Sequence, residues 1–405
     1  MDNLIEKFRM TDGRIQLQRS ILRLSVRCLT GMAATIFPAT AAEAYGHTTR
    51  MAEYAAQVQT SAEKYRYTPR EWKKIVRKSP DSFFCTDEAV RIAENVLDYQ
   101  RVTGGWPKNV AIHEPLGARR SEVLEAKKRR NDSTTDNDAT ILEMTYLARL
   151  YHQKPDERYK SALMKAVGFL LDGQYENGGW PQFWPENRGD YQTHITYNDN
   201  AMVQTLSVIR DLRDGKAPFD IVDDDAMKKR LSEAFDKGIE CILNTQIVVD
   251  GKPTVWCQQH DCKTLAPAKA RAYELPSFCS AESASLTYML MELPNPDERV
   301  ADAIKGAMKW FEDHKLTGIK VVRFIDDSGN SDTKVVEEAG AGPVWARYYD
   351  LEEAKPMFCD RDGVARRTLA EVGRERRGGY GWYNDSPAYL YPKYEKWLQK
   401  HKSFR

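Results

Sequence analysis

The sequence lacks a strong net charge of either sign. Its 405 residues include 60 Lys and Arg against 59 Asp and Glu, which gives a formal charge of +1. A protein that coats nucleic acid usually carries a large positive excess, so we expect no nucleic-acid partner. An anionic ligand would therefore have to be bound by a local cluster of cationic side chains.

Several common catalytic signatures are also missing. The sequence has no Gly-x-Ser-x-Gly elbow, no phosphate-binding Gly-Lys-Thr loop and no dinucleotide-binding fingerprint. The seven His residues form no His-Glu-x-x-His motif. These absences argue against the usual chemistry of serine hydrolases, nucleotide-dependent enzymes and zinc proteases.

No segment contains the roughly 20 apolar residues that a membrane span needs, so we expect none. Four arginines between positions 14 and 27 precede a weakly apolar run, residues 28–44, which ends in small residues. This layout predicts a secretory signal over residues 1–44 and a secreted or periplasmic protein with a single domain over 45–405. A basic helix that is not a signal is the alternative interpretation.

Few cysteines are present, and six remain after this leader. An even number suits disulfide bonds in an oxidising compartment, and Cys257 and Cys262 are close enough in sequence to pair. Buried free thiols explain the same count equally well. A zinc site is less favoured because no second close Cys pair occurs.

What the sequence does contain is an internal repeat. Gly104-Gly105-Trp106-Pro107 recurs at residues 178–181, and short acidic or amide-rich segments at 136–138, 198–200 and 281–284 each open an apolar helical pattern. Repeated helical hairpins predict a mainly α fold of the α/α toroid type, with the helix starts gathered at one end. Oxygen-bearing side chains gathered there suit calcium. Alternatively, they only cap the helices, and the Trp residues only fill space between helices.

Other segments have simpler patterns. Residues 45–100 are predicted to be helical, and the charged stretch 113–133 is predicted to be a long loop. Residues 319–325 and 333–337 are predicted to form a β-hairpin. The aromatic-rich tail, residues 380–397, is expected to pack across the body of the domain.

Six motifs, taken in order, resemble the pectate lyases of polysaccharide lyase family 10. They are Gly-Gly-Trp-Pro at 104, Thr-Asp-Asn-Asp-Ala-Thr at 135, Tyr-Asn-Asp-Asn-Ala-Met at 197, Arg-Ala-Tyr-Glu-Leu-Pro-Ser at 271, Pro-Val-Trp-Ala-Arg-Tyr-Tyr at 343 and Phe-Cys-Asp-Arg-Asp-Gly at 358. No single motif is specific, but their order from about 104 to 382 makes the set strong.

The resemblance implies an (α/α)3 toroid with short β segments and long loops. It also implies calcium-dependent (Ca2+) β-elimination of α-1,4-linked polygalacturonate, which leaves a 4,5-unsaturated end. By the same resemblance Arg271 is the catalytic arginine, Asp136 and Asp199 bind calcium, and Asn137, Arg347 and Arg361 face the substrate. Lys108 either reaches a substrate carboxylate or is simply solvated. We expect a monomer.

The proton acceptor is the difficult part of this chemistry. The pKa of a free arginine lies far above neutral pH, so its side chain is normally protonated. Arg271 can accept a proton only if neighbouring cations lower its pKa or if the medium is alkaline, so we expect an alkaline optimum. An ordinary ion pair between Arg271 and Glu274 is the competing interpretation.

Two other functions fit parts of the pattern. An α/α-toroid glycoside hydrolase would use paired carboxylates such as Asp138 and Asp199, about 6.5–9.5 Å apart if it inverts configuration. A non-catalytic polysaccharide-binding protein would use the same groove without turnover.

Overall fold

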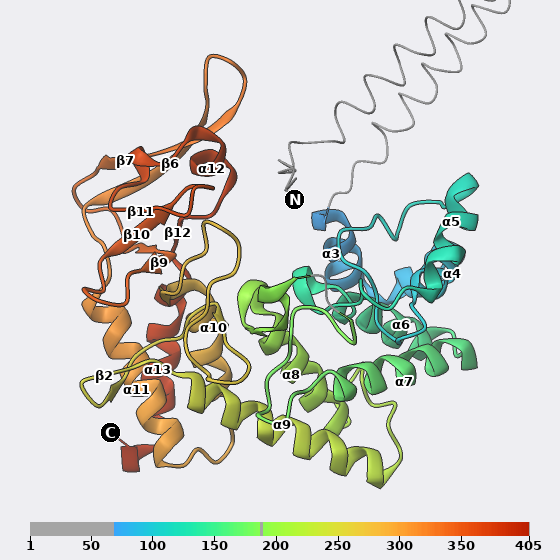
Figure 1. The fold of residues 1–405 in the computed structure, drawn as a ribbon. Helices are drawn as coiled ribbons and strands as arrows, with labels where there is room; N and C mark the ends of the chain where they lie inside the picture. Colours follow the sequence, from blue (N-terminus) through green and yellow to red (C-terminus); the bar gives the residue numbers. More distant parts are fainter. Residues whose placement is uncertain (1–68, 187–188, 405) are drawn as a thin grey trace, which may run out of the picture. The chain divides into compact units, whose positions relative to one another are not determined.

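Helices make up most of the regular structure in the computed structural model, which describes residues 69–186 and 189–404 (Figure 1). These residues belong to one compact unit, Tyr67–Arg405. The helices are α3 (Pro69–Lys78), α4 (Asp87–Tyr99), α5 (Arg120–Glu125), α6 (Ile141–Gln153), α7 (Glu157–Asp172), α8 (Ala201–Arg213), α9 (Asp225–Thr245), α10 (Ser280–Met291), α11 (Glu298–Asp313), α12 (Arg374–Gly379) and α13 (Tyr391–Lys400).

The strands are short and form several small antiparallel sheets. The four-stranded sheet has the order β11-β10-β9-β5, and the pairs are β1-β4, β12-β8, β2-β3 and β6-β7. Their bounds are β1 (Ile195–Thr196), β2 (Val248–Val249), β3 (Lys252–Pro253), β4 (Gln259–His260), β5 (Phe278–Cys279), β6 (Ile319–Ile325), β7 (Ser331–Glu337), β8 (Trp345–Ala346), β9 (Tyr348–Tyr349), β10 (Pro356–Cys359), β11 (Ala365–Arg366) and β12 (Tyr383–Asn384).

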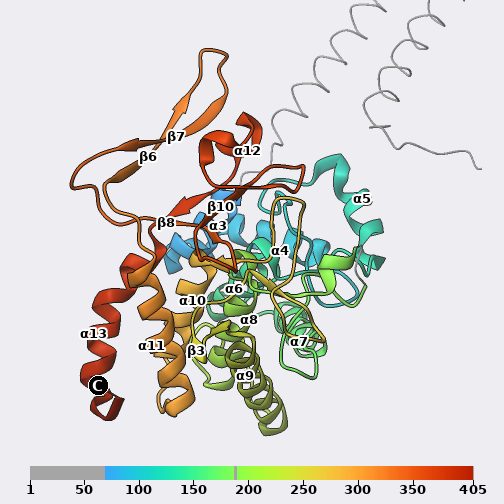
Figure 2. The ribbon, with the colours of Figure 1, turned by 60° about the vertical axis from the view of Figure 1, so that its left-hand side comes forward.

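Three helical hairpins form the body of the fold. Helix α6 packs on α7, α8 on α9, and α10 on α11. The first helices of the hairpins contact one another in the order α6-α8-α10, and the second helices do so in the order α7-α9-α11 (Figure 2). This arrangement is an inner and an outer layer of helices, which confirms the predicted mainly α, (α/α)3 toroid with short strands.

In each repeat, a buried tryptophan in the loop forms a hydrogen bond near the end of a preceding helix. The indole N–H groups of Trp106, Trp180, Trp256 and Trp345 donate to carbonyls near the ends of α4, α7, α9 and α11, at 2.7–2.8 Å. All four side chains are at most 1% exposed. The repeat therefore has four copies, although only two carry Gly-Gly-Trp-Pro. Filling space between helices is the role of Trp106 and Trp180, and the buried Trp184 shares it.

The two glycines before Trp180 have a steric reason. Gly178 has φ +89°, and a Cβ there would lie 1.9 Å from the carbonyl oxygen of Lys237 on α9. A Cβ on Gly179 would lie 2.5 Å from the Ile195 side chain. Only glycine lets the loop approach the neighbouring helix this closely.

The outer and inner helices begin in different ways. Asp156, Asp224 and Asp297 cap α7, α9 and α11, because each carboxylate accepts hydrogen bonds from backbone N–H groups of the first turn. Helices α6, α8 and α10 have no side-chain cap. Helix capping therefore does not explain the acidic residues before the inner helices.

Three segments outside the helical hairpins have local sequence patterns that predict their structure. Residues 319–325 form β6, which pairs with β7 as a hairpin, so that prediction is confirmed. The described part of 45–100 contains α3 and α4, as expected, and 45–68 lie outside the described residues. The prediction of a long loop over 113–133 is wrong, because α5 forms there and buries Val123 among its charged neighbours.

The disulfide interpretation is also wrong for this structure. All six cysteines of the described chain, Cys257 and Cys262 included, are free thiols. Burial raises the pKa of the Cys257 thiol, whose Sγ lies 3.8 Å from the Ala268 carbonyl oxygen. The predicted signal, residues 1–44, lies outside the described residues. Across 69–186 and 189–404, no helix has the length and apolar character needed to cross a membrane.

Candidate active site

Three carboxylates converge at the inner-helix starts. Asp136 lies in the 3₁₀ turn before α6 (η4, Asp136–Asp138), Asp199 lies in the turn before α8 (η6, Asn198–Asn200), and Glu282 lies in the first turn of α10. The two turns contact each other, and η6 contacts α10. Both predicted calcium ligands are therefore brought together, and Glu282 joins them.

The backbone of both turns explains their composition. Asn137 has φ +54° and Asp199 has φ +52°, which places them in the left-handed region. Asn and Asp tolerate this region better than other non-glycine residues. Left-handed turns redirect the chain just before the inner helices, and such strained backbone is often found at functional sites.

The acidic cluster (Asp136, Asp199 and Glu282) shows strong mutual repulsion at Asp199. Enclosure by the surrounding protein and, after it, the carboxylates of Asp136 and Glu282 together raise the pKa of Asp199 to about 6, against the lowering effect of nearby cations. The Asp199 side chain nevertheless keeps an exposed surface. An exposed carboxylate held close to two others is a favourable place for a cation.

Cationic and amide side chains surround the cluster. Lys108 Nζ pairs with Asp136, whose Oδ2 also accepts a hydrogen bond from Gln182 Nε2 at 2.7 Å. The Arg347 guanidinium pairs with Glu282 and donates to Asn198 Oδ1 at 3.0 Å. Lys108 is therefore bound to a carboxylate of the site and is not simply solvated.

These surrounding residues share one position in the repeat. Lys108, Gln182, Gln258 and Arg347 each follow a buried repeat tryptophan by two residues. Gln258 Oε1 accepts a hydrogen bond from Tyr348 OH. The hydrogen-bonded tryptophan of each loop thus fixes the position of the polar side chain two residues later. In the four loops these side chains are a lysine, two glutamines and an arginine.

Arg271 forms the ion pair that the competing interpretation expected. Its Nε donates to Glu274 Oε2 at 2.7 Å, and Tyr380 OH donates to Glu274 Oε1 at 2.7 Å. Although burial opposes it, the ion pair with Glu274 raises the pKa of Arg271 above its usual range. In the ligand-free protein Arg271 is therefore a cation.

Aromatic rings link the arginines into a row. The Tyr380 ring lies 5.8 Å from the Arg271 Cζ and 5.0 Å from the Arg347 Cζ. The Tyr273 ring lies 5.0 Å from the Arg271 Cζ and 5.8 Å from the Arg361 Cζ. The row therefore runs from Arg361 through Arg271 to Arg347, where it meets the acidic cluster.

Arg361 stands at the exposed end of this row. Its Nε and NH2 donate to Glu375 at 3.0 Å, and 62% of its side chain is exposed. Arg376 shares Glu375 and lies 4.9 Å from the Tyr273 ring. Two arginines on one carboxylate leave positive charge to spare for an anionic ligand.

The acidic cluster fits a calcium ion by its donor type. Asp199 offers an exposed carboxylate, and Asn137 and Asn198 add amide oxygens nearby, which are ligands that calcium prefers. A separate group, Glu71, His113 and Glu114, also meets metal-ligand distances. Its imidazole nitrogen makes it less suited to calcium than the oxygen donors of the acidic cluster.

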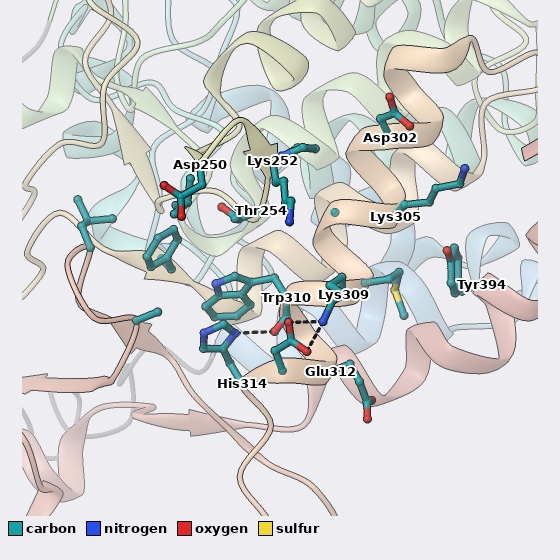
Figure 3. A pocket seen from close by; sticks show the side chains of 18 of the residues that line it. Asp250, Lys252, Thr254, Asp302, Lys305, Lys309, Trp310, Glu312, His314 and Tyr394 are labelled. Atoms are coloured by element: carbon teal, nitrogen blue, oxygen red, sulfur yellow. Dashed lines mark hydrogen bonds and ion pairs between the residues drawn. The ribbon is translucent and has the colours of Figure 1, made fainter.

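A cavity of about 600 Å³ opens beside the acidic cluster, and Asn137 and Asp199 line it. Asn137 Nδ2 donates to Asn109 Oδ1 at 3.2 Å across this wall. A larger cavity of about 1140 Å³ runs along α11 and is shown with Trp310, His314 and Lys309 in Figure 3. Among the described residues, its lining includes none of the predicted site residues, and its acidic side chains outnumber its lysines.

Sequence reasoning missed several members of the site. The segment 281–284 predicts only a helix start at Glu282, and no sequence motif gives a role to Gln182, Gln258, Tyr380 or Arg376. Two of them, Gln182 and Gln258, can be found from the sequence because each lies two residues after a repeat tryptophan. Tyr380 and Arg376 come from the C-terminal segment, and no local pattern places them beside Arg271.

The comparisons with known proteins agree with this geometry. The profile of the pectic acid lyase family matches residues 100–391. A family 10 polysaccharide lyase from Cellvibrio cellulosa is 32% identical with a TM-score of 0.68, and the match covers 81% of this chain and 95% of that one. A single-residue mutant of such an enzyme from the same organism, in complex with trigalacturonic acid, is 32% identical with a TM-score of 0.66 over 81% and 96% of the two chains. No curated protein sequence matches closely enough to count as a relative. The chain therefore belongs to the pectate lyases of polysaccharide lyase family 10.

Proposed function

We propose that this pectate lyase cleaves polygalacturonate by calcium-dependent β-elimination, with Arg271 as the base. The observation that carries the proposal is the row of arginines ending at the acidic cluster. Such a row can bind successive carboxylates of a uronate chain, while the carboxylate cluster binds the cation.

The elimination moves one proton and two pairs of bonding electrons, and the C4–O pair leaves with the glycosidic oxygen. Arg271 accepts the proton from C5, the C5–H electrons form the C4–C5 double bond, and the bond from C4 to the glycosidic oxygen breaks. The departing oxygen takes a proton from solvent, and the product carries a 4,5-unsaturated end. Bound calcium would supply positive charge next to the C6 carboxylate, where negative charge develops.

The side chains around Arg271 can bind the substrate and hold other residues of the site in position. Arg347 and Arg361 lie on either side of Arg271 in the row, so they can orient carboxylates of the units flanking the scissile bond. Lys108 holds Asp136 in place, and Asn137 faces the cavity that adjoins the cluster. Glu274 fixes the direction of the Arg271 guanidinium through two hydrogen bonds to its side chain.

The raised pKa of Arg271 sharpens the expected pH dependence. A base is active in its deprotonated form, so the rate should increase with pH as the neutral fraction of Arg271 increases. Binding of calcium nearby would add positive charge and shift the pKa of Arg271 downward. The raised pKa of Arg271 favours an alkaline optimum, and its lowering by bound calcium favours a strict requirement for the metal.

A hydrolase that uses Asp138 and Asp199 is not favoured. The two oxygens of Asp138 accept from Lys73 Nζ and Arg77 NH2, both at 2.8 Å. Both Asp138 oxygens are thus engaged by cationic side chains of α3, whereas a general acid needs an oxygen that can face the leaving group.

Arg271→Ala tests the proposal against a non-catalytic binding role. We expect turnover of polygalacturonate to fall by about a thousandfold or more, while binding measured by calorimetry changes by less than about tenfold. Arg230→Ala, at an exposed arginine on α9, is the matched control. If Arg271→Ala turns over polygalacturonate as fast as wild type, Arg271 is not the base. If neither protein shows turnover, the result supports a non-catalytic binding role.

We further propose that the protein is a secreted or periplasmic monomer. The basic and apolar pattern of residues 1–44 supports export, and the free thiols give no support from cysteine pairing. N-terminal sequencing of protein from the extracellular and periplasmic fractions should find a start near residue 45. Recovery of the full chain from the cytoplasm would contradict export, and light scattering would report the oligomeric state.

A further inference from the structure

The 600 Å³ cavity beside the acidic cluster has a cationic wall. Arg70, Lys73 and Arg77 of α3 line it. Their spacing of three and four residues places them on one face of the helix. Asn137 and Asp199 line the same cavity, so it is continuous with the candidate active site.

The positive charge of this wall exceeds what its partner neutralises. Lys73 and Arg77 both pair with Asp138, whose side chain is only 15% exposed. Their own side chains remain 47% and 42% exposed. Two half-exposed cations on a single carboxylate, with Arg70 beside them, can bind further anionic groups from the cavity side.

Aromatic side chains line another part of the cavity. Tyr288 and Tyr389 contribute to its lining, and their rings meet edge to face with centroids 5.9 Å apart. Lys393 Nζ lies 4.2 Å from the centre of the Tyr288 ring. Aromatic rings and cations together suit a ligand with an apolar ring face and a carboxylate edge, as in a uronic acid unit.

We propose that this cavity is a distal subsite for polygalacturonate, in which Arg70, Lys73 and Arg77 bind carboxylates of units remote from the scissile bond. This inference rests on the proposed function, because it needs a uronate chain in the neighbouring active site. The subsite makes affinity depend on chain length. The three cations of this wall lie on α3, which precedes the segment matched by the family profile, residues 100–391.

A charge-matched pair of double variants tests the subsite. Lys73→Gln with Arg77→Gln removes two charges from the cavity wall. Lys74→Gln with Lys78→Gln removes two charges from exposed positions of α3 outside the cavity lining. Melting temperatures and circular dichroism confirm that both variants fold, and initial rates are measured on galacturonate oligomers of three to eight units.

We expect KM for the longest oligomers to rise about five- to tenfold in the Lys73/Arg77 variant, since each exposed charge contact contributes about two- to threefold to affinity. The kcat should stay within about twofold, and KM for the trimer should change least. The KM of the variant should also depend less on salt, because fewer ion pairs form. Lys73→Arg with Arg77→Lys should restore the dependence on length.

Equal KM values for the two double variants at every chain length would overturn the subsite. A wild-type protein that yields no unsaturated product from any oligomer would instead overturn the proposed lyase mechanism. In that case calorimetric binding of the octamer to both variants still decides on the subsite, because binding does not depend on turnover.

Discussion

Glu274→Gln tests how Arg271 works. Glu274 is 2% exposed and holds Arg271 through Nε at 2.7 Å. A glutamine at this position has nearly the same shape, and its one carbonyl oxygen can still accept from the Arg271 Nε, but it carries no negative charge. The substitution therefore removes the interaction that raises the pKa of Arg271 while largely preserving geometry.

The size of the effect follows from the ion pair. Opposite unit charges about 4 Å apart interact by about 4 kcal/mol at an effective dielectric constant of about 20. Because 45% of the Arg271 side chain is exposed, solvent screening reduces this to about 1–1.5 kcal/mol. Loss of that interaction lowers the pKa of Arg271 by about one unit.

The assay is the pH–rate profile for formation of unsaturated product. If Arg271 is the base, the profile of Glu274→Gln should move by about one unit toward lower pH, because the neutral form of Arg271 appears at lower pH. Glu375→Gln is the control, since it removes a carboxylate from Arg361 and Arg376 but not from Arg271. A profile that stays in place while kcat falls would mean that Arg271 acts as a fixed cation and not as the base.

Three further substitutions probe the acidic cluster, a repeat loop and a buried carboxylate. Asp199→Asn should raise the stability of calcium-free protein at pH 8 by about 1 kcal/mol, because the raised pKa of about 6 makes wild type lose stability as pH rises from about 4 through 6. Differential scanning calorimetry should show this difference, and added calcium should stabilise wild type but not the variant. Gly178→Ala should lower the free energy of unfolding by about 2–4 kcal/mol in urea titrations, because a Cβ collides with the α9 backbone at positive φ; an unchanged midpoint would contradict this. Burial raises the pKa of Glu143 to about 7, so wild type should lose about 3 kcal/mol from this group as pH rises from about 4.5 through 7. Glu143→Gln should flatten that loss in urea titrations at several pH values, and parallel stability profiles of the two proteins would refute it.

The repeat explains what could be predicted from sequence. Two Gly-Gly-Trp-Pro copies and the acidic segments at 136 and 198 were enough to predict helical hairpins and a shared end for the carboxylates. The third and fourth copies were less visible because Trp256 and Trp345 lack the preceding glycine pair. Their indole N–H bonds to α9 and α11 identify them only in three dimensions.

The rest of the site depends on long-range contacts. Tyr380 meets Glu274 across 106 positions of sequence, and Arg347 meets Asn198 across 149. Sequence periodicity reports on neighbours within a helix or a hairpin, so it cannot place such partners. The resemblance to known pectate lyases supplied Arg271, Arg347 and Arg361, and only the structure links them through Tyr273 and Tyr380.

Calcium-dependent elimination is tested most directly by the ultraviolet absorbance of unsaturated product from polygalacturonate, followed first with calcium and then with chelator. We expect a steady increase with calcium at alkaline pH, which stops when chelator is added and resumes when calcium is restored. An increase that chelator leaves unchanged would contradict the role of the metal. No increase under either condition, or a release of reducing ends without absorbance, would contradict β-elimination itself.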